Sequence, residues 1–432
     1  MDIKKLCIDA SNASIQMAAA TTEQKNNALL AIADSLLQHR QAIIKANMED
    51  LERSEQESLA APLLKRLKFD EKKLNDVVEG IKSLVLLEDP IGKTLLSTEM
   101  DSGLELFKVT CPIGVIGIIF ESRPDALVQI STLCLKSGNS VLLKGGREAI
   151  NTNRILAEII DEASQKAGLP KGWISLLESR DDVNEMLKMD EYIDLLIPRG
   201  SNDFVRYIMN NSTIPVMGHA DGICHVYIDK AADMDMALKI AVDSKTQSVA
   251  VCNATETLLV HKDIAKDFLP TIKSIYESKK VKMLGCEKTL DIIDIEPASQ
   301  EDWKTEYLDY IISIKVVDDC DEAISHINTY GSGHTDSIVT SDKNTAVRFM
   351  NLVDSGNVFW NASTRFSDGF KYGFGAEVGI STSKLHARGP VGLEGLVSYK
   401  YMIAGEGHIV DDYATNKKSF SHKTISKRVQ DI

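Results

Sequence analysis

Apolar residues recur at intervals of three and four along the N-terminal part of the chain, which predicts helices over about the first 90 residues. Between Asn26 and Asn47 these positions form one broad stripe. The stripe consists of Leu29, Leu30, Ile32, Ala33, Leu36, Leu37, Ile43 and Ile44. The sequence Asp89-Pro90-Ile91-Gly92 ends the helical pattern, because proline and glycine favour turns.

From Cys111 onwards, short apolar runs alternate with segments of helical period. The expected strands are 114–120, 140–143, 173–177 and 193–197, and the expected helices are 126–136, 150–167, 182–188 and 203–210. Strands that are apolar at nearly every position and are joined by helices are typical of a parallel sheet covered on both faces.

A second set of the same kind follows Asp221. Its expected strands are 225–228, 257–261, 311–316, 337–340 and 358–360, and its expected helices are 234–245, 265–278, 322–327 and 345–353. Two further strand candidates, 105–109 and 398–403, flank the two sets. We therefore predict an α/β fold with two doubly wound domains and a ligand-binding cleft between them.

The composition is that of an ordinary soluble globular protein, with 44% hydrophobic and 26% charged residues among 432. The net charge of −14 argues against broad binding to nucleic acid or to anionic membranes. The N-terminus lacks the apolar stretch of a signal peptide, and the longest apolar runs are too short to span a bilayer. We expect a cytoplasmic protein without nucleic-acid or membrane partners.

The cysteines and histidines show no pattern of a structural site. The seven cysteines are odd in number and include no CxxC pair, and the nine histidines include no HExxH motif. This spacing argues against a disulfide framework and against a zinc site of the usual kind. We therefore expect a metal-free protein of a reducing compartment. The cysteines are at positions 7, 111, 134, 224, 252, 286 and 320.

Cys252 lies among small and polar residues between an expected helix and an expected strand. In that position a thiol can remain accessible to a ligand, whereas a thiol inside a packed helix cannot. Two interpretations of this residue stay open. It is either a nucleophile that forms a thioester, or a buried small hydrophobic residue, which is the fate of most free cysteines.

Two strand-to-helix turns are suited to a phosphate-bearing cofactor. The first contains Lys144, Gly145, Gly146 and Arg147, so the backbone can approach a ligand closely beside positive charge at a helix N-terminus. The second is 197–201, with a glycine and a hydroxyl. Each alone could be an ordinary turn, but both should open on the carboxyl edge of one sheet. The chain has no GxGxxG motif after a strand.

Arg123 also follows an expected strand and is placed to receive an anion, although an exposed arginine before a proline-started helix is the ordinary alternative. The segments 361–369 and 373–379 are loop-like and polar. Long loops of this kind are commonly functional or disordered, and the aromatic residues within them argue against disorder.

Seven segments together resemble one known family. They are PIGVIGIIFESRPD (112–125), LLKGGREA (142–149), LIPRGS (196–201), HADGICHVY (219–227), VCNATETLLVH (251–261), NASTRFSDG (361–369) and GAEVGISTSKLHARGPVGLEGL (375–396). Over roughly residues 10–415 the chain is similar to the glutamate-5-semialdehyde dehydrogenases, also called gamma-glutamyl phosphate reductases, a branch of the aldehyde dehydrogenase superfamily.

The resemblance implies NADPH-dependent reduction of L-glutamyl 5-phosphate to L-glutamate 5-semialdehyde with release of phosphate, the second step of proline biosynthesis from glutamate. It implies that Cys252 is the catalytic nucleophile, and that the dinucleotide binds without a GxGxxG motif. Arg123 and Arg365 are the candidates for the phosphate and the α-carboxylate, because arginine pairs with both kinds of anion. Asn361 is a third candidate for substrate binding.

The resemblance also assigns the cofactor contacts. Lys144 matches the lysine near the adenosine ribose, Gly145 and Gly146 allow close approach, Gly200 and Ser201 match the turn near the pyrophosphate, and Glu306 matches the glutamate that holds the nicotinamide ribose.

Two departures from the hydrolytic aldehyde dehydrogenases are informative. Those enzymes activate water with a glutamate, and the matching stretch 216–221 contains none, as suits a thioester that must survive until it is reduced. They also use an asparagine as oxyanion donor where this chain has Ser122. The oxyanion donor therefore stays open among the Cys252 backbone N–H, Ser122 and Asn253.

The resemblance implies an NADP-binding domain at 1–220, interrupted by a β arm near 97–111, a catalytic domain at 221–385, and an oligomerisation arm with a tail at 386–432. We expect a homodimer or homotetramer, and possible functional association with glutamate 5-kinase. The rival functions are an acylating dehydrogenase for another acyl phosphate, an aldehyde oxidiser, and a non-catalytic binding or assembly protein.

Overall fold

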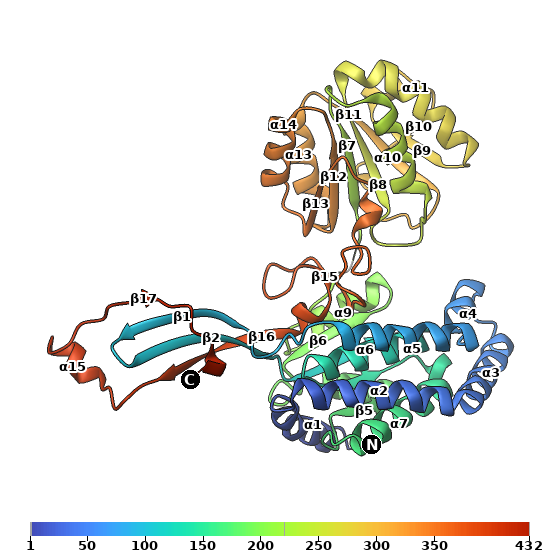
Figure 1. Cartoon of the computed structure of the whole chain (residues 1–432). Helices are drawn as coiled ribbons and strands as arrows, with labels where there is room; N and C mark the ends of the chain where they lie inside the picture. Colours follow the sequence, from blue (N-terminus) through green and yellow to red (C-terminus); the bar gives the residue numbers. More distant parts are fainter. Residues whose placement is uncertain (1, 220, 432) are drawn as a thin grey trace.

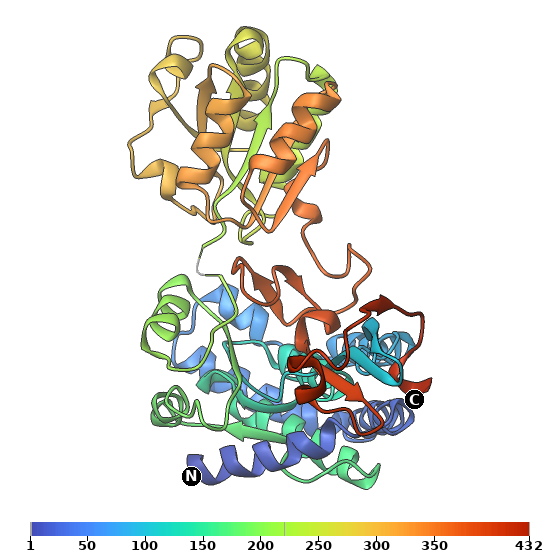
Figure 2. The same ribbon diagram turned by 90° about the vertical axis from the view of Figure 1, so that its left-hand side faces the viewer.

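The computed structural model describes residues 2–219 and 221–431, and it contains two α/β blocks and a projecting antiparallel arm (Figures 1 and 2). The predicted α/β fold with two doubly wound blocks is confirmed. The predicted boundary between the first two domains falls at Ala220, which lies outside the described residues. No helix within the described ranges combines the length and the apolar character needed to cross a membrane.

Five helices precede the first sheet. α2 begins with a capping box, in which the Thr21 hydroxyl accepts from Gln24 N and the Gln24 side chain accepts from Thr21 N. The stripe predicted over 26–47 is divided between two helices, because the chain leaves helical geometry at His39, whose Nδ1 donates to Ser35 O at 2.8 Å. The helices are α1 (Ile3–Met17), α2 (Thr22–Gln38), α3 (Arg40–Gln56), α4 (Ala61–Leu67) and α5 (Glu71–Leu86).

The first sheet is parallel, with strand order β5-β4-β3-β6. Alternate residues of β3 enter two different cores: Ile116 and Ile118 pack with α2, α5, α6 and α7, and Val115 and Ile119 pack with α1 and α8. This burial on both faces explains why the strands are almost continuously apolar. The elements are β3 (Val115–Phe120), α6 (Pro124–Lys136), β4 (Ser140–Lys144), α7 (Ile150–Lys166), β5 (Ile174–Leu177), α8 (Arg180–Met186), β6 (Leu195–Arg199) and α9 (Asn202–Asn211).

The second sheet is also parallel, with strand order β10-β9-β11-β8-β7-β12-β13. Helices α10 and α11 cover one face, and α13 and α14 cover the other. The short strands β9 and β10, at one side of this sheet, were not predicted, because such short segments lack a clear apolar period. The elements are β7 (Cys224–Ile228), α10 (Met234–Thr246), β8 (Thr255–His261), α11 (Lys262–Ser278), β9 (Lys282–Gly285), α12 (Glu287–Leu290), β10 (Glu296–Pro297), β11 (Ile311–Val317), α13 (Cys320–Tyr330), β12 (Thr335–Val339), α14 (Lys343–Leu352) and β13 (Asn357–Trp360).

After the second sheet the chain returns to the first block. A short hairpin of β14 (Gly379–Ser381) and β15 (Gly389–Val391) leads into this return. Val378, Val391 and Leu396 are buried in the core that α2, α5, α6 and α7 form against the first sheet. The Asn139 side chain donates to Leu396 O at 2.8 Å and fixes the same connection. The core of the first block therefore needs residues from both ends of the sequence.

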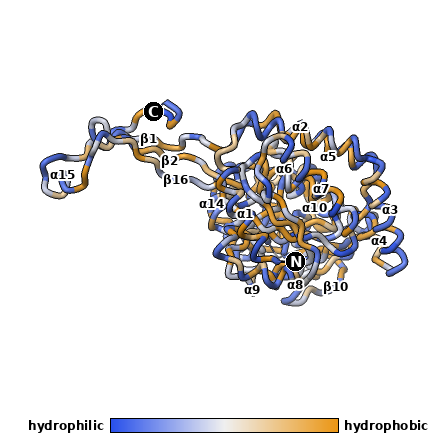
Figure 3. The backbone as a smooth tube through the Cα atoms, turned by 90° about the horizontal axis from the view of Figure 1, so that it is seen from below, coloured by the Kyte–Doolittle hydropathy of each residue, from blue (hydrophilic) through white to orange (hydrophobic). Residues whose placement is uncertain are grey.

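The arm extends away from the body of the molecule (Figures 1 and 3). Its strands are antiparallel in the order β16-β2-β1-β17, so the predicted strands 105–109 and 398–403 pair with each other within this chain. β16 lies at one edge of the arm, and Tyr401 and Ile403 on it are 59% and 62% exposed. The elements are β1 (Thr94–Asp101), β2 (Leu104–Pro112), β16 (Val397–Ala404), α15 (Val410–Ala414) and β17 (Lys423–Thr424).

Candidate active site

Cys252 lies in the loop between α10 and β8, as its sequence context predicts, and its side chain is partly exposed. Because it precedes β8 in a parallel sheet, it lies at the amino ends of the second set of strands. Gly222 packs directly against this loop: a Cβ placed on Gly222 would meet Cys252 O at 2.1 Å and Cys252 Cα at 2.5 Å. The backbone of the candidate nucleophile is therefore held by a close contact that only glycine permits.

The electrostatic surroundings of Cys252 do not favour a thiolate in this arrangement. Burial raises the pKa of the thiol to about 12, and the negative charges of Glu306 and Glu377 act in the same direction. Arg199 opposes them. Reactive cysteines usually have a lowered pKa. The pKa of the Cys252 thiol is raised instead, so this thiol carries its proton at neutral pH here.

Two histidines lie beside Cys252. One ring nitrogen of His219, one of His334 and Cys252 Sγ all lie within 4.8 Å of one another. The two rings meet edge to face, with centroids 4.8 Å apart. Burial lowers the pKa of both histidines, so both are neutral at pH 7.

The arginines approach the site from both blocks. Arg365 follows the second sheet, its Nε donates to Gln247 Oε1 at 2.9 Å, and its charge is close enough to interact with the Cys252 thiol. Arg199 is the last residue of β6 and acts on Cys252 from the first block. Arg123 Nη2 donates to Asp125 Oδ2 at 3.2 Å, and its charge is close enough to interact with Arg199. The cleft is thus positively charged where an anionic substrate would meet the thiol.

Three predicted side chains already have partners. Both the N–H and the hydroxyl of Ser122 donate to Glu148 Oε1 at 2.6 Å. Asn253 Nδ2 donates to Ser367 O at 2.7 Å. Asn361 bonds to the backbone of one residue: Oδ1 accepts from Thr340 N at 3.0 Å and Nδ2 donates to Thr340 O at 3.1 Å. These bonds use one of the two amide N–H groups, so a substrate contact by Asn361 does not require them to break.

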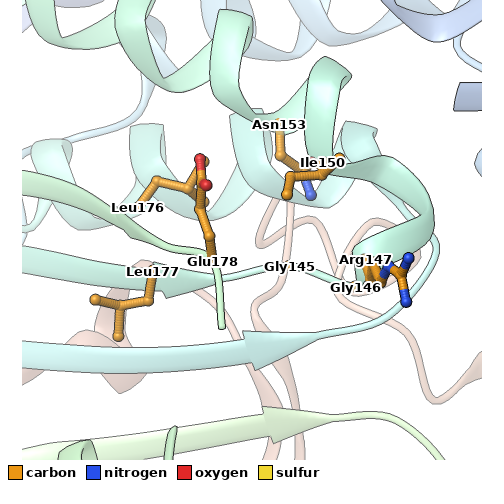
Figure 4. Close-up of a pocket in the computed structure, with 8 residues that line it drawn as sticks. All are labelled: Gly145, Gly146, Arg147, Ile150, Asn153, Leu176, Leu177 and Glu178. Atoms are coloured by element: carbon orange, nitrogen blue, oxygen red, sulfur yellow. The ribbon is translucent and has the colours of Figure 1, made fainter. Parts of the chain in front are cut away.

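The turn after β4 forms a pocket with the turn after β5, as Figure 4 shows. A Cβ on Gly145 would lie 2.1 Å from Asn153 Nδ2, and one on Gly146 would lie 2.0 Å from Glu148 Oε1. A side chain at either position would therefore displace Asn153 or Glu148, and the role of the two glycines in cofactor binding stays a prediction. Lys144 is buried beside them and its Nζ donates to Gly145 O at 2.5 Å. The pocket is lined by Gly145, Gly146, Arg147, Ile150, Asn153, Leu176, Leu177 and Glu178.

The turn after β6 connects the two blocks. A Cβ on Gly200 would lie 2.9 Å from the Phe204 ring, and the N–H of Ser201 donates to Glu121. Asn202, the next residue, donates through Nδ2 to Glu306 Oε2 at 2.7 Å. Gly200, Ser201 and Glu306 were predicted separately from short motifs. The structure brings the turn that contains Gly200 and Ser201 next to Glu306, whose charge acts on Cys252.

Several residues of this site were missed by the sequence interpretation. Arg199 has a local signal, because it ends a parallel strand just before a predicted cofactor turn. Glu377, His219 and His334 have no such local signal in the sequence. They reach Cys252 only through the tertiary fold.

Comparison with known proteins shows what the chain is similar to. The model of the aldehyde dehydrogenase family matches residues 1–292 and 292–391. Gamma-glutamyl phosphate reductases of Ruminiclostridium cellulolyticum and Acetivibrio thermocellus are 73% and 69% identical, and the alignments cover 100% and 99% of both chains. The crystal structure of gamma-glutamyl phosphate reductase from Thermotoga maritima has a TM-score of 0.93 at 41% identity, and the alignment covers 95% of this chain and 100% of that one.

Proposed function

Since the chain belongs to the aldehyde dehydrogenase family and, within it, to the gamma-glutamyl phosphate reductases, we propose that it reduces L-glutamyl 5-phosphate to L-glutamate 5-semialdehyde with NADPH. The reaction releases phosphate and is the second step of proline biosynthesis. The observation that carries the proposal is that Cys252 lies close enough to interact with the charges of both Arg199 of the first block and Arg365 of the second. We also propose that the protein acts in the cytoplasm.

In the proposed mechanism the thiol loses its proton and Cys252 Sγ attacks the acyl carbon. The bond from carbon to the phosphate oxygen breaks, phosphate leaves, and a thioester remains on the enzyme. NADPH supplies the hydride that reduces this thioester. Collapse of the resulting thiohemiacetal releases the aldehyde and restores the cysteine. The Cys252 backbone N–H is the proposed oxyanion donor, because Ser122 and Asn253 have the partners described above.

The residues of the first block fit a dinucleotide. Gly145 and Gly146 line a pocket with their backbone, and Lys144 and Arg147 add positive charge beside it. Glu178 in the same pocket is neutralised by Arg154, whose Nε donates to Glu178 Oε1 at 2.9 Å. This pairing removes a negative charge that would oppose a 2′-phosphate, and so favours NADPH.

The reverse reaction tests the whole proposal. Purified protein given glutamate 5-semialdehyde and NADP⁺ is expected to form NADPH only when inorganic phosphate is present. An aldehyde oxidiser would form NADPH without phosphate, and a binding protein would form none. Acetyl phosphate in the forward direction separates a general acyl phosphate reductase from one that requires the glutamyl group. We also propose functional association with glutamate 5-kinase, because that enzyme's acyl phosphate product is reactive toward water.

Replacing Arg365 with alanine is expected to raise the KM for the acyl phosphate far more than the KM for NADPH. Losing one charge-assisted pair costs roughly 1.5–3 kcal/mol, or about 10- to 150-fold. Steady-state kinetics with each substrate varied in turn measures both constants. Arg348→Ala is the matched control, because Arg348 is exposed on α14, away from the candidate site, and pairs with Asp321. Equal losses for both substrates would give Arg365 a structural role instead.

We propose that the arm joins two subunits in a homodimer or a dimer of dimers. β16 is an edge strand with exposed apolar side chains, and such an edge can add to the sheet of another copy. Light scattering is expected to give a mass of two or four chains, and a chain truncated after Gly395 is expected to be monomeric. Ile403→Lys tests the same edge without removing the arm. A monomeric full-length protein would contradict the proposal.

A further inference from the structure

The side chains of His219, Cys252 and His334 form a cluster that the proposed reaction does not use in full. Their donor atoms lie within 4.8 Å of one another, although the residues belong to three separate segments. His219 precedes β7, Cys252 precedes β8, and His334 precedes β12. All three therefore lie at the amino ends of neighbouring strands in one parallel sheet. Imidazole nitrogen and thiolate sulfur are the ligands that Zn²⁺ prefers in proteins.

His219 is held in the tautomer that a metal ligand needs. Its Nδ1 lies 2.8 Å from Ile380 O, and a carbonyl oxygen can only accept, so Nδ1 carries the proton. The lone pair is then on Nε2. Histidine ligands almost always donate their second ring N–H to a carbonyl or carboxylate in this way, which fixes the ring and its proton.

His334 provides the second, independent observation. Its side chain is fully buried, and its Nε2 has no hydrogen-bond partner among the described residues. Nδ1 of the same ring is 2.8 Å from Thr335 Oγ1. Buried polar atoms are nearly always paired, so an unpaired buried ring nitrogen on one of the three side chains of this cluster is available to a ligand.

Charges of both signs lie around the cluster. Glu306 and Glu377 both act on Cys252 with negative charge, which disfavours a free thiolate. A divalent cation bound to the sulfur would be stabilised by the same two carboxylates. Arg199 and Arg365, whose charges also interact with Cys252, oppose the binding of a cation.

We propose that His219, Cys252 and His334 form a site for a thiophilic divalent cation of the Zn²⁺ class, which blocks the nucleophile when it is filled. On binding, the S–H bond breaks and its proton goes to solvent, an S–metal bond forms, and each imidazole contributes a lone pair. The fourth position stays open to water or to a phosphate oxygen. Tetrahedral bonds of about 2.0–2.3 Å require the three side chains to move inward by about 1 Å. The expected inhibition of the enzyme by the cation rests on the proposed function, whereas the binding of the cation does not.

Cadmium titration of the full-length, reduced protein tests the binding. One equivalent of Cd²⁺ is expected to produce the ultraviolet charge-transfer absorption of a cadmium–thiolate bond and to release protons. Cys252→Ser is expected to abolish this absorption. His219→Gln and His334→Gln are each expected to weaken binding by at least about tenfold. Cys286→Ser is the matched control and is expected to bind normally, because Cys286 lies at the start of α12 with Thr289 as its partner. Circular dichroism shows that each variant is folded.

Absorption that persists in Cys252→Ser, or that is unchanged in both histidine variants, would overturn the site. A second experiment tests the consequence. Zn²⁺ is expected to inhibit phosphate-dependent NADP⁺ reduction in proportion to occupancy, and a chelator is expected to restore the activity. Stoichiometric binding at Cys252 without inhibition would leave the site intact and would instead contradict the assignment of Cys252 as the nucleophile.

Discussion

Replacing Cys252 with serine is expected to abolish reduction of the acyl phosphate, while the fold and the binding of NADPH remain intact. Loss of the nucleophile in a covalent mechanism can cost up to about 10⁶-fold in kcat. Serine is isosteric, but an alkoxide forms far less readily than a thiolate, and an oxygen ester resists reduction more than a thioester does. Steady-state rates measure the loss, and titration of NADPH fluorescence checks that the cofactor site is unchanged.

Cys286→Ser is the control for this experiment, because it removes a partly exposed thiol outside the candidate site. It is expected to retain full activity. Substantial turnover by Cys252→Ser would refute the thioester mechanism.

Replacing Lys245 with methionine is expected to lower the free energy of unfolding by about 3–5 kcal/mol. Lys245 Nζ lies 2.6 Å from Glu256 Oε2, and both side chains are completely buried. Methionine has a similar length, so the main loss is the charge, and Glu256 is left buried without its partner. Lys245 is on α10 and Glu256 is on β8, so the pair joins the two elements on either side of the Cys252 loop. Denaturant unfolding of both proteins measures the difference.

The loss of unfolding free energy in Lys245→Met should increase as the pH rises. Burial raises the pKa of Glu256 from 4.5 to about 7, although Lys245 lowers it. Without Lys245 the pKa rises further, so the native state keeps a proton that the unfolded state gives up above about 4.5. Stability of the variant therefore falls as pH rises, and the deficit is larger near pH 8 than near pH 5. Lys288→Met, which breaks an exposed pair with Asp318, should change little. A deficit that does not vary with pH would show that Glu256 is not the buried acid responsible.

The layered fold could be predicted because its strands are buried on both faces. The apolar run of β3 and the helical period of α10 are properties of neighbouring residues, so they are visible in the sequence. The break between α2 and α3 was not predicted, since the apolar stripe continues through His39 and only the bond from its ring to Ser35 O marks the end of the helix. β9 and β10 were missed because their positions depend on pairing, of β9 with β11 and of β10 with β9, rather than on their own residues.

The residues of the candidate site were likewise predicted only where a local pattern marks them. Cys252 and the glycines of the cofactor turns were identified because a thiol in a loop and two adjacent glycines after a strand are local patterns. Their roles come from the resemblance and remain predictions. His334 lies far from Cys252 in sequence, and a search for metal ligands by spacing could not detect a cluster assembled from three strand ends. Asn361 was proposed from its place in a conspicuous polar loop. Its amide bonds to Thr340, and its role in substrate binding stays a prediction.

The discontinuous first block has a consequence for the newly made chain. The β1–β2 hairpin leaves the ribosome about 285 residues before β16, its neighbour in the finished arm. At typical rates of synthesis this interval lasts roughly 15 to 60 s. During that time the hairpin has an open edge, and the core against α2 and α6 lacks Val378, Val391 and Leu396. The nascent protein thus exposes apolar surface until translation is nearly complete, and this is the period in which chaperone binding and aggregation compete for it.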